Sequence, residues 1–234
     1  MPLDHTVKAF DEDMERVRSI VVAMGGLVEK QFTRALDAVR YGDLRLASLV
    51  LADEAMVNQM QVQADLLCNQ VIARRQPIAI DLRELVGAIH TIHDLERIGD
   101  EAKKIAIRSK GIETYPERAS LPLEQVTTMA EHVRSMLARA LDAMVRHDAA
   151  LASTVAGMDV EVDRERDALQ ENLLARMGTD AGAIAAALDT MFVVQSIERI
   201  GDHAKNLAEY VINIVEGVDM RHTGRAAAET PAKA

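Results

Sequence analysis

Apolar residues recur every three to four positions along nearly all of this 234-residue chain. That spacing is the period of an amphipathic α-helix, whose apolar stripe faces a core. Turn-forming and helix-breaking residues interrupt the pattern at five places, and the pattern therefore predicts six long helices. The interruptions are Gly42–Asp43, Gln76–Pro77, residues 111–122, His147–Asp148 and Gly178–Asp180.

Residue types near two of these breaks predict how the helices begin and end. Asp81, followed three residues later by Glu84, resembles a capping box that opens the third helix. Gly178 is expected to end the fifth helix, because glycine readily adopts the left-handed conformation found there. Thr179 or Asp180 is then expected to cap the sixth helix.

The chain contains an internal repeat. The string Ala35–Ala38 returns as Ala140–Ala143, and Glu-Arg-Ile-Gly-Asp occurs at both 96–100 and 198–202. A five-residue identity at equivalent positions of two helical halves indicates duplication. We therefore expect an all-α fold made of two tandem, pseudo-symmetric three-helix bundles.

The repeat sets the expected domain boundaries. Residues 1–112 are assigned to the first three-helix unit and residues 123–220 to the second. Residues 113–122 form the linker, which contains two prolines and a serine. Residues 221–234 are polar and rich in alanine, and we expect this tail to be disordered.

The repeated string places a pair of carboxylates on each half: Glu96 and Asp100, then Glu198 and Asp202. On a helical wheel Glu96 and Asp100 continue the apolar stripe that begins at Leu82 and Leu85. Two carboxylates four residues apart repel each other by roughly 0.2–0.5 kcal/mol on an exposed helix. A buried charge must be paired or must bind a metal, so the pattern makes these four residues candidate metal ligands.

Gly99 and Gly201 lie beside these carboxylates in the middle of a helix. A glycine there costs about 1 kcal/mol relative to alanine. The same cost at the same place in both halves indicates that the missing side chain makes room for another backbone or for a ligand.

The second and fifth helices supply further oxygen donors. Glu54 and Asn58 flank the apolar stripe of the second helix, and Asp159 and Asp163 hold the matching places on the fifth. Oxygen donors of this kind suit Mg²⁺, Ca²⁺, Mn²⁺ or iron. The plainer alternative is an acidic face neutralised by neighbouring basic residues. The bases near the repeated strings are Arg97, Lys103, Arg199 and Lys205.

Composition narrows the function classes. The formal net charge of −10 argues against a nucleic-acid binder and favours cations or a basic partner. The single cysteine, Cys68, falls among apolar residues and is expected to be buried. No uninterrupted apolar run reaches the ~18 residues needed to span a bilayer, and the polar start is unlike a signal peptide. We therefore expect a cytoplasmic protein that meets the membrane only through partners.

An enzyme is not expected. The sequence has neither of the common glycine-rich phosphate-binding motifs, and no base is implied for Cys68. His93 precedes Glu96 by three residues, which is the reverse of the order in di-iron bundles. It could add a ligand, but a hydrogen bond with the neighbouring helix is the simpler role.

Taken together, these strings resemble the PhoU family from about Val17 to His222. The family pattern is a duplicated three-helix bundle carrying E(D)-x-x-x-D motifs, which correspond here to residues 96–100, 159–163 and 198–202. Other matching strings are Met24–Glu29, Ala73–Pro77, Asp81–Arg83 and Gly217–His222.

The resemblance implies a cytoplasmic accessory protein of the high-affinity phosphate ABC transporter and a negative regulator of the phosphate-starvation response. Its implied partners are a phosphate-sensing histidine kinase, the ATPase subunit of the transporter and a second copy of the chain. Multinuclear iron or zinc, or Mg²⁺ or Mn²⁺, is implied at the acidic motifs. Asn58 departs from the pattern, because it replaces the second acid of its motif, and this weakens the expected site in the first half. The alternative is a metal-free helical adaptor whose acidic faces bind basic partner surfaces.

Overall fold

The computed structural model describes residues 3–217, and this part of the chain is helical almost throughout and contains no strand. The six long helices expected from the sequence are confirmed. Their bounds are α1 Leu3–Tyr41, α2 Leu44–Arg75, α3 Ala79–Thr114, α4 Leu123–Arg146, α5 Ala149–Thr179 and α6 Ile184–Glu216, with short 3₁₀ turns η1 Pro116–Ser120 and η2 Ala181–Ala183.

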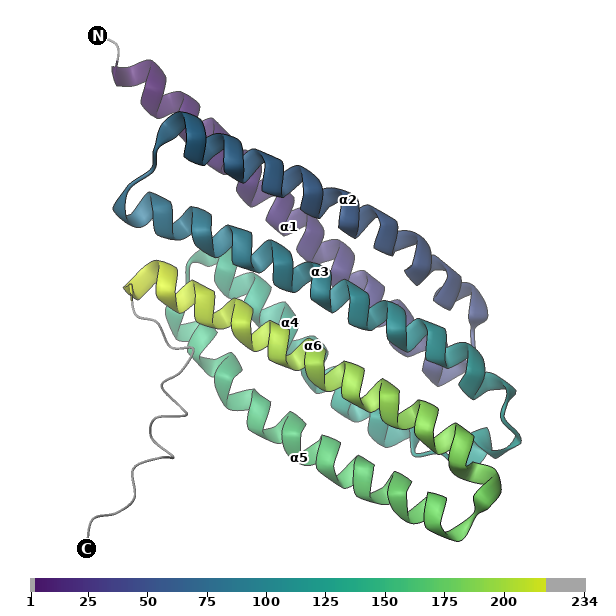
Figure 1. The fold of residues 1–234 in the computed structure, drawn as a ribbon. Coiled ribbons are helices and arrows are strands. Elements are labelled where there is room, and N and C mark those ends of the chain that lie inside the picture. The colour runs from purple at the N-terminus through teal and green to yellow at the C-terminus, as the bar shows by residue number, and fades with distance from the viewer. Residues whose placement is uncertain (1–2, 218–234) are drawn as a thin grey trace, which may run out of the picture.

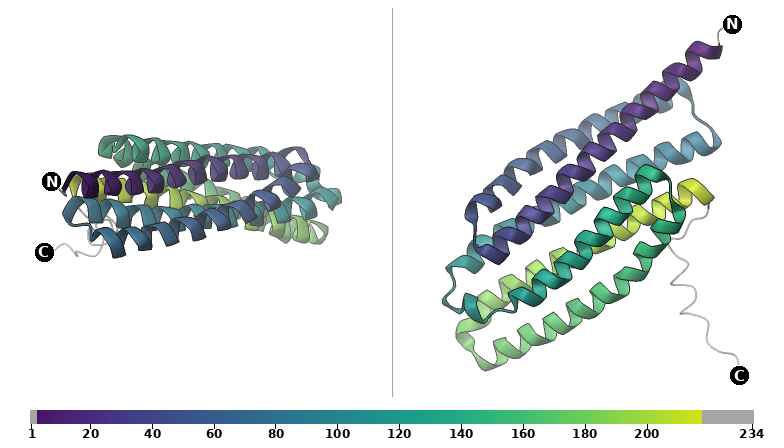
Figure 2. Two further views of the ribbon diagram at one scale, coloured as in Figure 1. Left: turned by 90° about the horizontal axis from the view of Figure 1, so that it is seen from above. Right: turned by 180° about the vertical axis from the view of Figure 1, so that it is seen from behind.

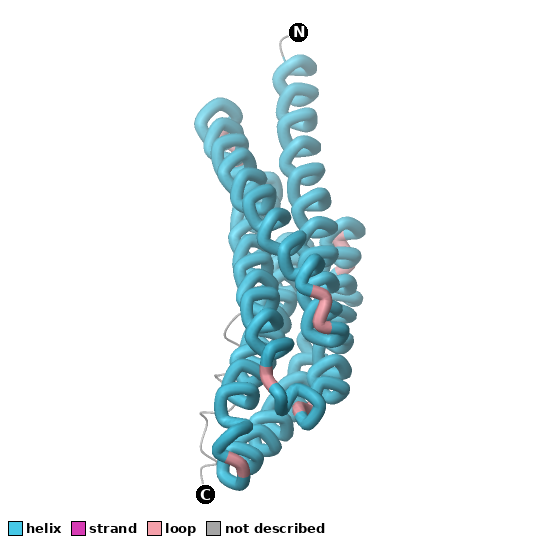
Figure 3. The backbone as a smooth tube through the Cα atoms, turned by 90° about the vertical axis from the view of Figure 1, so that its right-hand side faces the viewer, coloured by secondary structure: helices cyan, strands magenta, loops and turns pink. Residues whose placement is uncertain are grey.

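The helices form two three-helix bundles that lie side by side, α1–α3 and α4–α6 (Figure 1). Helices α3 and α6 run antiparallel along the junction, and α1 packs on α4 behind them (Figure 2). The outer helices α2 and α5 pack chiefly within their own bundles. All six follow one long axis, so the loops gather at the two ends of the molecule (Figure 1), and these connections are short compared with the helices (Figure 3).

The apolar stripes of both halves merge into one continuous core. In the first half Phe32, Leu95 and Ile98 have no exposed surface, and in the second half Leu137, Ile200 and Leu207 are equally enclosed. Because α3 and α6 contact neighbours on several sides, they are buried on wider faces than the outer helices. This position holds the repeated strings rigidly in the middle of the molecule.

Glycines allow the two bundles to approach closely. A methyl group added at Gly87 on α3 would lie 2.5 Å from Ile214 Cδ1 on α6, and one at Gly25 on α1 would lie 2.7 Å from Leu141 Cδ2 on α4. Both are far closer than carbon atoms normally pack. The junction therefore depends on missing side chains at these two positions.

Several predicted helix ends are confirmed in detail. Gly42 has φ +68°, and the Asp43 carboxylate accepts a hydrogen bond from the Arg45 amide at the start of α2. Asp148 likewise accepts from the Leu151 amide and caps α5. Both are side-chain N-caps of the ordinary kind.

Two predicted ends are wrong. Helix α3 begins at Ala79 after Ile78, so Asp81 lies within the first turn and forms no capping box. Gly178 lies inside α5, which continues to Thr179. The Asp180 carboxylate accepts from the Gly182 amide and caps the turn η2 rather than α6 itself. In both places the helix includes residues whose types also suit a cap, so residue type alone does not fix where the helix ends.

The predicted linker is shorter than expected. Helix α3 continues to Thr114, and the connection to α4 contains the 3₁₀ turn at Pro116–Ser120. Arg118 fixes this turn by donating to the carbonyls of Val39 and Arg40 at the end of α1. The predicted tail, 221–234, lies outside the described residues.

Among the described residues, one helical stretch, Ala181–Glu216, is long and apolar enough to cross a membrane by length and composition. It corresponds to α6 with its preceding turn, which packs against α3, α4 and α5. The same apolar residues form the junction between the bundles, so core packing accounts for their hydropathy.

Candidate functional site

The acidic residues of the first half gather between α2 and α3. The Glu54 carboxylate on α2 is buried and accepts hydrogen bonds from Gln31 Nε2 on α1 (3.1 Å) and from Asn58 Nδ2 one turn along α2 (3.3 Å). Gln31 also donates to two backbone carbonyls, those of Val50 and Gly99. Glu54 is thus held by three helices.

Asp100 faces Glu54 across this contact. Lys103 Nζ lies 3.7 Å from Glu54 Oε1 and 3.6 Å from Asp100 Oδ1, so one ammonium group sits between two carboxylates. Burial raises the pKa of Glu54 and the neighbouring Asp100 raises it further, whereas the hydrogen bond from Gln31 and the positive charge of Lys103 oppose the rise. The charge of Lys103 thus offsets part of the cost of the buried Glu54 carboxylate.

Gly99 makes the close contact between these side chains possible. A methyl group at this position would lie 3.1 Å from Gln31 Oε1 and 3.2 Å from Glu54 Oε2. The sequence predicted that the missing side chain admits another backbone or a ligand. In the structure it admits two polar side chains of the neighbouring helices.

The second half repeats the arrangement between α5 and α6 with different partners. Lys205 Nζ on α6 lies 2.5 Å from Asp159 Oδ2 on α5, and this hydrogen bond raises the pKa of Lys205. Arg166 on α5 contacts Asp163 Oδ1 at 2.8 Å and Glu198 Oε1 at 2.6 Å. Asp159, Asp163 and Glu198 thus each form an ion pair with a basic side chain, at 2.5, 2.8 and 2.6 Å respectively.

Asp202 differs from the other three, because no side chain among residues 3–217 forms a hydrogen bond or ion pair with it. Partial desolvation beside α5 raises its pKa, and the charges of Glu198, Asp159 and Asp163 raise it further, against the opposing charge of Lys205. Asp202 therefore lies close enough to three other carboxylates, those of Asp159, Asp163 and Glu198, to be repelled by each of them. A cation brought to Asp202 would relieve repulsion among all four.

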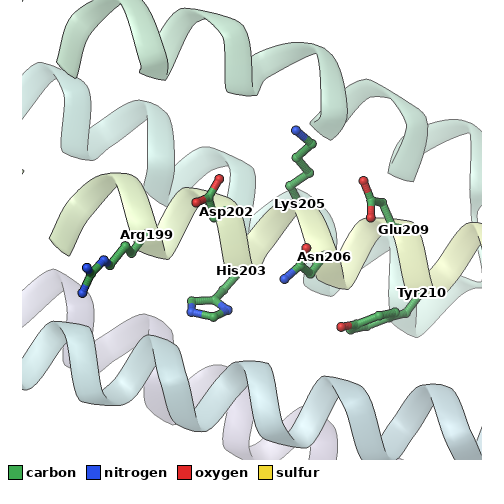
Figure 4. A pocket seen from close by; sticks show the side chains of 7 residues that line it. All are labelled: Arg199, Asp202, His203, Lys205, Asn206, Glu209 and Tyr210. Atoms are coloured by element: carbon green, nitrogen blue, oxygen red, sulfur yellow. The ribbon is translucent and has the colours of Figure 1, made fainter. Parts of the chain in front are cut away.

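A shallow pocket of about 480 Å³ lies along α6 at this place. Figure 4 shows Asp202 and Lys205 on one side of the helix, whereas Arg199 and His203 point to the other side, toward α3. The motif on α6 thus directs Asp202 toward α5, whereas Arg199 points toward α3 and the junction between the bundles.

The predicted ligands fall into two groups that lie in different bundles. Glu54 and Asn58 on α2 meet Asp100 on α3 in the first bundle. Glu96 lies one turn before Asp100 on α3, and its Oε2 is 3.7 Å from Arg97 Nε. The four acids of the second half meet around Arg166 and Lys205. Within residues 3–217, no three His, Cys, Asp or Glu side chains are arranged closely enough to hold a metal ion. The candidate oxygen donors therefore lie near one another, but their present side-chain positions do not form a metal-binding site.

The expected inward direction of Glu96 and Asp100 is met only in part, because their side chains are 18% and 29% exposed. Leu82 is exposed, so it does not form a core stripe with them, and the fully buried stripe of α3 contains Leu95 and Ile98. Helix α3 turns that stripe inward because it packs against α1, α2 and α6. The carboxylates lie at its half-buried edge, next to α2.

Sequence reasoning missed the polar contacts across the junction. His203 Nδ1 on α6 lies 2.7 Å from Asp94 Oδ1 on α3, and Arg199 lies 3.4 Å from the buried Glu101. The available signal was weak, because the two acids are seven residues apart on α3 whereas their basic partners are four residues apart on α6. It gives no indication of which helices pair.

His93 and Cys68 behave as the simpler interpretations predict. His93 Nδ1 lies 3.1 Å from Gln61 Nε2 on α2 and is exposed. Cys68 is buried, and desolvation raises the pKa of its thiol to about 11.

Comparison with known proteins agrees with this geometry. The PhoU domain family model matches residues 21–108 and 126–211, which are the two bundles. A Pseudomonas aeruginosa protein described as a phosphate-specific transport system accessory protein PhoU homolog is 42% identical over 221 residues, covering 94% of this chain and 90% of its own. The Escherichia coli protein described as phosphate-specific transport system accessory protein PhoU is 36% identical over 220 residues, again covering 94% and 90%.

A solved structure agrees as well. The crystal structure of PhoU from Pseudomonas aeruginosa superposes with a TM-score of 0.84 at 41% identity, covering 89% of this chain and all of that one. The match spans both bundles and their junction. This chain belongs to the PhoU family.

Proposed function

We propose that this protein is a cytoplasmic accessory protein of a high-affinity phosphate ABC transporter and restrains the phosphate-starvation response. The observation that carries the proposal is similarity over 94% of the chain to relatives described as phosphate-specific transport system accessory proteins. The same fold could serve other purposes, but the similarity extends over both bundles rather than over one of them.

The proposed partners are the ATPase subunit of the transporter, a phosphate-sensing histidine kinase and a second copy of the chain. An all-helical scaffold with a net charge of −10 suits this role, because its surface can attract basic patches on several partners. It would couple the state of the transporter to the kinase by contact rather than by chemistry.

Metal binding at the acidic motifs is part of the proposal. In the second bundle the donors are Asp159, Asp163, Glu198 and Asp202, whose oxygens suit iron, zinc, Mg²⁺ or Mn²⁺. The raised pKa of Asp202 supports this, because partial burial and the charges of Glu198, Asp159 and Asp163 all disfavour its carboxylate form, and a bound cation would stabilise that form. Binding requires the side chains of Arg166 and Lys205 to move aside.

The first bundle is proposed to bind metal more weakly. Asn58 contributes no charge and donates its amide hydrogen to Glu54. Glu54 also accepts from Gln31, so fewer of its lone pairs remain for an ion. Glu96 and Asp100 are the remaining donors there.

The specific alternative is a metal-free adaptor. It is favoured by Arg166, which already bridges Asp163 and Glu198 and occupies the position that an ion would take. In that case the basic side chains of a partner would replace Arg166 and Lys205. Metal analysis of the purified protein separates these two forms of the proposal.

Gene deletion tests the regulatory role. Loss of the protein should raise expression of a phosphate-starvation reporter in phosphate-rich medium, and the wild-type gene supplied in trans should restore repression. Unchanged reporter expression in the deletion strain would overturn the proposal. Pull-down of the kinase and the transporter ATPase by the wild-type protein tests the partners separately.

A further inference from the structure

A large apolar cleft lies away from the acidic motifs, where α1, α3, α4 and α6 meet. Its volume is about 740 Å³, which is within the range of pockets that enclose ligands. Much of its lining is apolar or small, contributed chiefly by Val22, Ala23, Gly26, Leu141, Val145 and Ile214. Val22 is 52% exposed and Val145 is 60% exposed. An exposed hollow of this kind marks a binding surface.

The border of the cleft is mainly acidic. Glu15, Glu29, Glu84 and Asp142 line it, against Arg18 and His147. Arg18 lies 2.6 Å from Glu84 and 3.5 Å from Glu15, and Arg146 lies 2.8 Å from Asp142, so four carboxylates face two arginines. The remaining negative charge favours an occupant that carries apolar side chains together with basic ones.

The chain itself supplies such a segment at the edge of the cleft. Helix α6 ends at Glu216, and Gly217 (φ +74°) terminates it in the left-handed conformation. Ile214, which lines the cleft, is three residues earlier, a rise of roughly 5 Å along the helix. Gly217 also packs against the guanidinium of Arg83, the residue before Glu84. The chain therefore leaves the structure beside this cleft.

The sequence that follows matches the chemistry of the cleft. Val218 and Met220 are apolar, and Arg221 and Arg225 carry positive charge. Seventeen residues, 218–234, lie beyond α6, which is enough chain to reach across the hollow. Attachment at Gly217 keeps the segment at a high effective concentration near its site.

We propose that residues 218–225 dock into this cleft of their own chain, with Val218 and Met220 against Val22 and Val145, and the two arginines near the acidic border. The docked segment closes an apolar surface at the junction of the bundles. This inference goes beyond the proposed regulatory function and does not depend on metal binding.

Thiol labelling tests the proposal, because the single natural cysteine is buried and its raised pKa makes it slow to react. Val145→Cys places a thiol in the cleft. Its reaction with a neutral maleimide should become roughly fivefold faster when residues 218–234 are removed, if the free cleft is about one-fifth populated in the full chain. Val62→Cys on α2, at 57% exposure and outside the cleft lining, is the matched control and should not change.

A second variant separates docking from a change in charge. Val218→Ser with Met220→Ser keeps both arginines and should accelerate labelling of Val145→Cys almost as much as truncation. A synthetic peptide of residues 218–234 added to the truncated chain should slow labelling again. Equal rates with and without the tail would overturn the proposal. Protection that grows with protein concentration would also overturn it, because it would show a second copy in the cleft.

Discussion

Replacement of Gly99 by alanine is expected to lower the free energy of unfolding, whereas the same change at Gly201 raises it. The two glycines occupy the same place in the repeated string, and alanine is favoured over glycine by about 1 kcal/mol inside a helix. The difference comes from what the new methyl group would meet. At Gly99 it would lie 3.1 Å from Gln31 Oε1 and 3.2 Å from Glu54 Oε2.

The magnitudes follow from these distances. At Gly201 the nearest atoms are Val133 Cγ2 at 3.4 Å and Val162 Cγ1 at 3.8 Å, which are ordinary packing distances, so the gain of about 1 kcal/mol is retained. At Gly99 the methyl group must displace two polar atoms in a buried hydrogen-bonded cluster. Overpacking of this kind costs roughly 1–3 kcal/mol, which leaves a net loss of about 1 kcal/mol after the helical gain.

Urea unfolding followed by circular dichroism at 222 nm measures both changes through the midpoint at constant slope. Gly157→Ala on α5 is the matched control, because a methyl group there would have no neighbour within 4 Å and reports the helical gain alone. Gly201→Ala should resemble this control. If Gly99→Ala were as stabilising as Gly157→Ala, the close packing of Gln31 and Glu54 on Gly99 would be refuted.

Three further changes are expected to have definite effects. Gln31→Met should destabilise the protein by about 1–3 kcal/mol, because the buried Glu54 carboxylate loses a hydrogen-bond donor. The control is Met136→Leu at the equivalent position of the second half, which should cost less than about 1.5 kcal/mol in the same urea titration. Arg108→Ala should destabilise by about 1 kcal/mol, because it removes both the 2.7 Å pair with Asp189 and the stacking on Phe192 across the junction; a thermal midpoint unchanged within error would contradict it. Cys68 should resist maleimide in the native protein and react fully in urea, and rapid native labelling would show that the α2 packing is wrong.

The period of the apolar residues and the repeated string were enough to predict six helices and two bundles. These signals are strong because each helix must bury one face, and the duplication presents the same pattern twice. Helix ends were less predictable. Asp81 and Gly178 have residue types that suit caps, yet both lie inside their helices.

The acidic clusters were only partly predictable. Glu54 and Asp100 were chosen from the repeat, and they do meet in the structure. The roles of Gln31 and Arg166 depend on how helices pack, which residue spacing along one helix does not encode. The wheel placed Glu96 and Asp100 with Leu82, but the α2, α1 and α6 contacts of α3 select a different face as the core.

Metal content of protein purified without chelator tests the proposed function of the acidic clusters most directly. Elemental analysis after micromolar metal supply should find bound metal in the wild-type protein. The double variant Glu198→Gln with Asp202→Asn should lose most of the bound metal. The double variant Glu96→Gln with Asp100→Asn should lose less of it. Both variants should keep the helix content of the wild-type protein. Wild-type protein that binds no metal under these conditions would contradict the metal-binding account and leave the adaptor.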